Sequence, residues 1–136
     1  MTTDIDPAVK AIITGWRDPV REAALEVRSL IFDTASTLPQ VGVLSEMLKW
    51  NQPAYLTSQT AAGTTIRLGE TRDGTRLGLY VHCQTSLIDT FRLHYGGQLE
   101  FEKKRAIILH PDISNMLKPL RHCIALALTY HSSKAG

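Results

Sequence analysis

The spacing of apolar residues is helical along the first third of the chain, where they recur every three or four positions. This spacing predicts a first helix that begins at Asp6-Pro7, a capping residue followed by proline. A second, long helix is expected after Asp18-Pro19, the same start signal. Its apolar face comprises Val20, Ala24, Val27, Ile31 and Leu38. A third, shorter helix is predicted over residues 43–48, ending before Pro53, because a residue that precedes proline disfavours helical geometry.

The apolar period changes to two in the middle of the chain, which is typical of β-strands. Residues 53–57 are predicted to form a first, short strand. Apolar and polar residues then alternate around residues 65–68 and again over 77–83. Between these two runs lies Asp73-Gly74, a dipeptide that suits the positive φ angles of a tight turn. The sequence therefore predicts an antiparallel hairpin within residues 64–83.

Helical spacing returns after the hairpin. Ser86 and Asp89 resemble a capping pattern before a short helix that Gly96-Gly97 would end. Residues 105–109 are predicted to form a buried strand, which residues 99–101 either extend or accompany as a separate strand. The last helix is expected to begin at Asp112, with Pro119 either kinking it or starting the helix proper after a preliminary turn.

Strands in the middle with helices at both ends favour the α+β class. We expect a central antiparallel sheet of four to five strands, with N-terminal and C-terminal helices packed on it. No repeat or linker divides the chain, so residues 1–136 are predicted to form a single domain.

Composition and charge narrow the environment of this domain. A net charge of +2 offers no concentrated basic face, so neither a nucleic acid nor a membrane surface is expected as a partner. The N-terminus lacks the pattern of a signal peptide, and no apolar stretch is long enough to cross a bilayer. Cys83 and Cys123 are too few for a secreted disulfide framework. We therefore expect a cytoplasmic protein with reduced thiols.

The segment Glu46-Met47-Leu48-Lys49-Trp50-Asn51-Gln52-Pro53-Ala54-Tyr55 resembles the signature of the YdhG-like family of bacterial domains of unknown function. The likeness extends over about residues 20–131. It implies an antiparallel sheet packed against helices, sometimes compared with the frataxin fold, and some relatives are described as frataxin-like intracellular iron chaperones. It implies no catalytic residues. This chain departs from the family at an insertion, residues 58–63, and at residues 100–104, two loop-like places where a binding surface could have changed.

The candidate ligand site is an aromatic cluster. A hydrophobic pocket is predicted between sheet and helices, lined by Trp50, Gln52, Tyr55, Tyr80 and Phe91. Aromatic surface with an amide suits a small ligand. The alternative interpretation is a structural corner, in which Trp50 plugs a helix-to-strand junction and Gln52 satisfies backbone groups.

Other chemistry has weaker support in the sequence. The candidate metal ligands are His82, Cys83, His94, His110, His122, Cys123 and His131. They lack the close pairs of a zinc site, so no metal site is predicted. The frataxin comparison implies iron held by a ridge of surface carboxylates. The acids that come nearest to such a ridge are Asp18, Glu22, Glu26 and Asp33, with Glu22 and Glu26 one helical turn apart. Interleaved arginines equally favour an ordinary solvated face with ion pairs.

No catalytic or cofactor-binding motif is present, and no cofactor is expected. The sequence therefore favours a non-catalytic binding domain for an unknown small ligand or protein partner. An iron chaperone and an enzyme without a recognisable motif are the alternatives. The ligand and the oligomeric state stay open.

Overall fold

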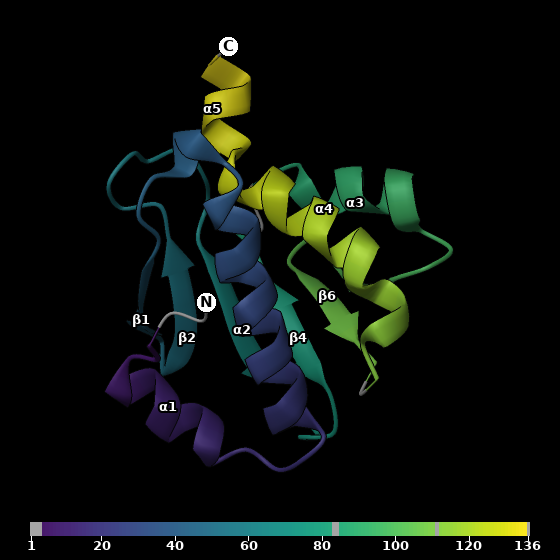
Figure 1. Cartoon of the computed structure of the whole chain (residues 1–136). Coiled ribbons are helices and arrows are strands. Elements are labelled where there is room, and N and C mark those ends of the chain that lie inside the picture. The colour runs from purple at the N-terminus through teal and green to yellow at the C-terminus, as the bar shows by residue number, and fades with distance from the viewer. Residues whose placement is uncertain (1–3, 83–84, 111, 136) are drawn as a thin grey trace.

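The computed structural model describes residues 4–82, 85–110 and 112–135. The helices are α1 (Pro7–Thr14), α2 (Val20–Ser36), α3 (Leu87–Tyr95), α4 (Leu117–Leu128) and α5 (Tyr130–Ala135), with short 3-10 turns at Pro39–Val41 and Ser114–Met116. The strands are β1 (Ser45–Lys49), β2 (Gln52–Leu56), β3 (Ile66–Glu70), β4 (Leu77–Tyr80), β5 (Glu100–Glu102) and β6 (Ala106–Leu109). Figure 1 shows α1, α2 and α4 on one side of the sheet.

The sheet has six strands in the order β1-β2-β3-β4-β6-β5, and every neighbouring pair is antiparallel. The predicted α+β class is confirmed, with six strands in place of the four to five expected. The additional strand is β1, and residues 100–102 form the separate strand β5, which pairs only with β6.

The predicted hairpin is formed by β3 and β4, in which Arg67 pairs with Tyr80 and Glu70 with Leu77. Its connection is longer than a tight two-residue turn. The Thr71 amide donates to the Arg76 carbonyl at 2.8 Å, which closes a loop around Asp73-Gly74. Gly74 has a φ of 73°, the left-handed conformation for which glycine was expected here. Cys83, at the end of the predicted strand, lies outside the described residues.

The helix predicted over residues 43–48 is wrong, because this segment forms strand β1. Lys49 pairs with Gln52. The connecting residues Trp50 and Asn51 have φ angles of 54° and 59°, as a two-residue type I′ hairpin turn requires. The alternation of β1 is hard to see in the sequence because an inward position holds a charged residue, Glu46, and the turn contains no glycine.

The helix starts follow the sequence unevenly. The Asp6 carboxylate caps α1 by accepting from the Ala8 and Val9 amides at 2.9 and 3.1 Å, as expected. The capping bond predicted for Ser86 is absent from α3; instead, the Ser86 carbonyl accepts from the Thr90 amide and hydroxyl. Pro119 lies in the first turn of α4, which follows the 3-10 turn, so it starts this helix and does not kink it.

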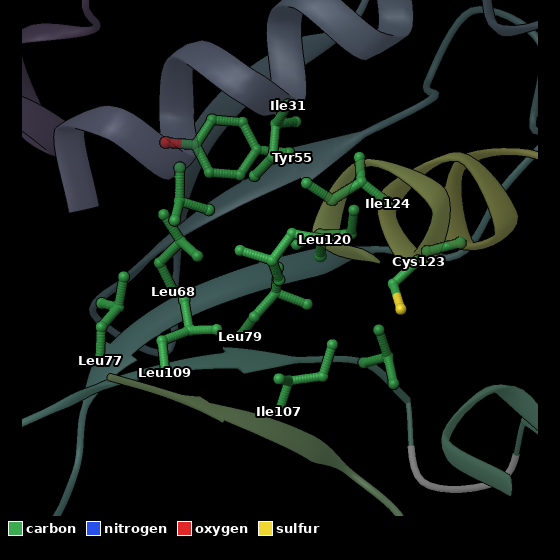
Figure 2. Close-up of a cluster of buried hydrophobic side chains, with 14 of the residues drawn as sticks. Ile31, Tyr55, Leu68, Leu77, Leu79, Ile107, Leu109, Leu120, Cys123 and Ile124 are labelled. Atoms are coloured by element: carbon green, nitrogen blue, oxygen red, sulfur yellow. The ribbon is translucent and has the colours of Figure 1, made fainter. Parts of the chain in front are cut away.

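The core lies between one face of the sheet and the helices. Figure 2 shows Leu68, Leu79 and Ile107 from the strands beneath Ile31 of α2 and Leu120 of α4. Strand residues alternate between two faces, so the residues between these core positions point to the opposite side. We call that side the outer face. It carries Gln52, Ala54, Arg67, Gly69, Gly78, Tyr80, Glu100, Glu102, Ala106 and Ile108. No described helix is both long and apolar enough to span a membrane.

Candidate functional site

The five residues of the predicted pocket are not gathered in one place. Tyr55 and Phe91 are fully buried in the core, and Trp50 is 86% exposed at the tip of the β1–β2 hairpin. Gln52 and Tyr80 lie on the outer face, where each contacts Arg67: the guanidinium donates to the Gln52 side-chain oxygen at 2.6 Å and lies 5.9 Å from the Tyr80 ring centroid. Trp50 therefore plugs no junction, and Gln52 binds a side chain in place of the backbone.

Tyr80 lies over Gly78 on the outer face, and Gly69 makes room for the Gln52 side chain beside it. Gly69 and Gly78 are cross-strand partners on β3 and β4. A Cβ atom placed on Gly78 would lie 2.7 to 2.8 Å from the Tyr80 ring and hydroxyl, too close for any side chain. The ring thus covers the Gly78 backbone and is half-buried. Its hydroxyl makes no hydrogen bond with the residues that the structure describes.

A cleft of about 830 Å³ opens beside Tyr80 on the outer face, over the neighbouring strands β4, β6 and β5. Its walls are loop 71–76 on one side and the segment 100–105 on the other, and Tyr80 and Ile108 also line it. A concavity of this volume is in the range of small-molecule sites. The cleft therefore replaces the interior of the protein as the candidate ligand site.

The loop at one wall is ordered by its own side chains. The Asp73 carboxylate accepts hydrogen bonds from the Thr71 hydroxyl at 2.7 Å, the Thr75 hydroxyl at 2.8 Å and the Thr75 amide at 3.1 Å. These hydrogen bonds, the Thr71 hydroxyl first among them, lower the pKa of Asp73 to about 2. The loop is thus a pre-formed turn that holds Arg72 at the cleft.

The opposite wall is a strained turn held by an arginine. Lys103 has a φ of 51°, a left-handed conformation that favours glycine. Arg92 of α3 donates to the Lys103 carbonyl at 2.6 Å, and its guanidinium lies 5.5 Å from the Phe101 ring centroid. Residues 100–104 were expected from the sequence to be a loop-like place where a binding surface could have changed. They form one wall of the cleft.

The ionic side chains of the cleft are mostly paired. Arg76 bonds Glu100 at 3.0 Å and donates to the Leu109 carbonyl at 3.1 Å. Arg105 bonds Glu102 at 3.4 Å. Burial raises the pKa of Tyr80, and the nearby negative charge of Glu102 raises it further. The Tyr80 hydroxyl therefore keeps its proton at neutral pH.

A second polar cluster is sealed inside the protein. Arg28 forms a two-pronged ion pair with Glu46, with Nε to Oε2 at 2.6 Å and Nη2 to Oε1 at 3.0 Å, and both side chains are at most 5% exposed. The Tyr55 hydroxyl donates to Glu46 at 2.9 Å, and the Asp6 amide donates at 3.0 Å. Burial raises the pKa of Tyr55 strongly, while the hydrogen bond to Glu46 raises that of Arg28. The Glu46 carboxylate thus accepts four hydrogen bonds. Through them it links β1 to α2, to β2 and to the start of α1.

The histidines meet only in part. Tyr95 and His122 share a hydrogen bond of 2.6 Å, and the rings of His94 and His122 lie 5.1 Å apart. Cys123 is buried, and burial raises the pKa of its thiol to about 12. Throughout the part of the chain that the structure describes, no three His, Cys, Asp or Glu side chains come together to hold a metal ion. Cys83 lies outside that part.

The proposed iron ridge is an exposed face of α2. Glu22 and Glu26 both point to solvent. Of the other two acids near this ridge, Asp18 bonds Arg21 at 2.8 Å and Asp33 bonds Arg121 at 3.1 Å. The carboxylates are therefore interleaved with arginine partners, as in an ordinary helix surface.

Sequence reasoning missed Arg72, Arg76 and Ile108, which line the cleft without belonging to any motif. No family model matches the chain, and comparisons with curated proteins and with solved structures found no match.

Proposed function

We propose that this protein is a non-catalytic binding domain whose ligand site is the cleft on the outer face, between loop 71–76 and segment 100–105. The observation that carries the proposal is the cleft itself: about 830 Å³ bounded by two pre-ordered turns, with a half-buried tyrosine beside an apolar floor at Ile108. Sites of this size with a few fixed polar groups are typical of small-molecule binding. The carboxylates of the cleft have structural partners: Glu100 and Glu102 are each paired with an arginine, and Asp73 orders its own loop, which supports binding over catalysis.

The family resemblance is part of this proposal. From residue 52 onwards the chain has the hairpin, short helix, strand and closing helix that the YdhG-like layout implies. We also propose a cytoplasmic location, because two cysteines are too few for the disulfide framework of a small secreted domain.

The proposal is tested by titrating the ¹⁵N-labelled protein with small acids, amines and neutral aromatic compounds, and following the amide resonances by NMR. We expect saturable shifts that cluster at residues 71–76, 80 and 100–108. Replacing Ile108 by Trp should fill the cleft floor and abolish them. Replacing Met47 by Trp, a residue on the same face but distant from the cleft, should leave them unchanged.

Two outcomes would contradict the proposal. Shifts that concentrate at the Trp50 hairpin or in the core would place binding elsewhere. A complete lack of shifts across the probe set would remove the cleft as a ligand site.

A further inference from the structure

The cleft has more positive than negative charge that is available to a ligand. Four cationic side chains and three carboxylates line it. The carboxylates of Glu100 and Glu102 are each paired with an arginine. The Asp73 carboxylate accepts three hydrogen bonds and keeps its negative charge, so the lining has a net charge of +1. Arg72 and Lys103, by contrast, form no ion pair with any residue that the structure describes.

The two cations without an ion pair sit on turns that are already ordered, at opposite ends of the cleft: loop 71–76 precedes Leu77, and the turn at Lys103 precedes Ala106, the partner of Tyr80. Loop 71–76 is fixed by Asp73, and the turn at Lys103 is fixed by the Arg92 side chain. A ligand that binds beside either turn does not have to order its backbone, which lowers the entropy cost of binding.

Lys103 occupies a conformation that costs a non-glycine residue about 1–2 kcal/mol. Backbone strain of this kind is common at ligand sites, so the Lys103 side chain is a candidate ligand contact. Its ammonium group faces a cleft that also offers the protonated Tyr80 hydroxyl as an unpaired donor. Cations and a neutral hydroxyl are the groups that recognise an anion.

The floor of the cleft adds a second requirement. Ile108 is an apolar side chain on the outer face, and it pairs across the sheet with Gly78, over which the Tyr80 ring lies. Ile108 is only 8% exposed, so the half-buried Tyr80 ring supplies most of the apolar surface beside the cations. A ligand that covers it gains from removing apolar area from water.

We infer that the cleft binds small organic anions, in which a carboxylate or phosphate meets Arg72 or Lys103 at one end of the cleft while an apolar ring or chain lies on Ile108 and Tyr80. This inference rests on the proposed function and narrows it to one ligand class. The shared chemistry is an anionic head with an apolar body.

Four probes separate the two requirements: benzoate and phenyl phosphate have both parts, acetate lacks the apolar body, and benzamide lacks the charge. Amide shifts at residues 71–76 and 100–108 give the dissociation constants. We expect benzoate or phenyl phosphate to bind at least fivefold more tightly than benzamide and acetate. Raising the salt concentration should weaken the two anionic aromatic probes and leave benzamide unchanged, because screening acts on charge alone.

Matched variants assign the charges. Arg72→Gln combined with Lys103→Gly should reduce benzoate binding to the level of benzamide. Lys103→Gly alone should not lower stability, since glycine relieves the strained φ. Lys104→Gln removes the neighbouring cation, which does not line the cleft, and should leave benzoate binding unchanged. Tyr80→Leu should weaken benzoate and benzamide alike.

The outcomes distinguish this inference from the proposed function. If benzamide shifts the cleft amides as strongly as benzoate does, or if the double variant still prefers benzoate, the ligand class is wrong while the cleft remains a binding site. If no probe shifts these amides, both the ligand class and the proposed function fail.

Discussion

Four donors converge on the Glu46 carboxylate: two nitrogens of Arg28, the Tyr55 hydroxyl and the Asp6 amide. Arg28 also lies over the Phe32 ring at 4.8 Å, and that ring meets Tyr55 edge to face. Removing one partner from a buried ion pair leaves an uncompensated charge, which costs far more than an exposed pair contributes. Glu46 should therefore be among the residues least tolerant of substitution.

Replacing Glu46 by Gln should lower the free energy of unfolding by about 3–5 kcal/mol, because the buried Arg28 guanidinium loses its counter-charge. Tyr55→Phe, which removes one hydrogen bond to a charged group, should cost about 2 kcal/mol. Urea unfolding at neutral pH measures both. Glu22→Gln on the exposed face of α2 is the control and should change stability by less than about 0.5 kcal/mol. A loss below 1 kcal/mol for Glu46→Gln would contradict the buried-pair account.

Cys123 is expected to lower the free energy of unfolding at alkaline pH. The ordinary pKa of a thiol is 9.0, and burial raises that of Cys123 to about 12. Between these values the unfolded chain loses the thiol proton and the folded protein keeps it, so stability falls as pH rises. The contribution of this one group is a slope of about 1.4 kcal/mol per pH unit.

Cys123→Val should remove this contribution and leave the rest of the alkaline titration in place. Free energies of unfolding measured from pH 8 upwards for both proteins give the difference, in which all other groups cancel. The two curves should diverge above about pH 9. Parallel curves would show that the thiol does not titrate with unfolding.

At the scale of elements, alternation and helical spacing predicted α1, α2, β2, β3, β4 and β6 from the sequence. They failed at β1, where Val43, Leu44, Met47 and Leu48 imitate helical spacing. The inward partner that would have completed the alternating pattern is Glu46, and its burial depends on Arg28, a residue on a different element. A pattern read along one segment cannot show a charge that is neutralised from another.

Gly63 is where the loop between β2 and β3 passes closest to α4. A Cβ atom here would lie 2.4 Å from the Leu128 carbonyl carbon and oxygen and 2.5 Å from the Ala127 oxygen. These are backbone atoms, so the loop or the helix end has to move. Gly63→Ala should cost about 1–3 kcal/mol in urea unfolding, as overpacking does.

Gly97→Ala is the matched control, since nothing lies within 4 Å of its Cβ position. It should be neutral within about 0.5 kcal/mol. Equal losses at the two sites would show that the cost is a general property of glycine in this chain and not a clash with α4.

At the scale of the whole molecule, the class was predictable and the candidate site was not. Tyr80 was chosen from the sequence for its aromatic surface, and segment 100–104 as a loop-like place where a binding surface could have changed. Arg72, Lys103 and Ile108 reach one cleft only because β6 inserts between β4 and β5. Sequence order gives no sign of that insertion, because the pairing of distant strands depends on tertiary packing.

The strand order also separates early from late folding events. β1 to β4 form a meander in which each strand pairs with the next one in the sequence. β6 pairs with β4 across the intervening α3 and β5, a longer separation in sequence. Local pairings cost less loop entropy. Leu68→Ala in β3 should therefore slow folding, and Leu120→Ala in α4 should mainly speed unfolding, as measured by the two arms of a chevron plot. A slower folding rate for Leu120→Ala alone would reverse this order.

In this folding order the cleft forms last, when β6 and β5 pair with the folded β1–β4 meander. A partly unfolded chain would keep the β1–β4 hairpins and lose segment 100–105, the wall of the cleft that lies later in the sequence. Ligand affinity would then report directly on whether the last third of the chain is docked, and a bound ligand would protect that third from proteolysis more than the rest.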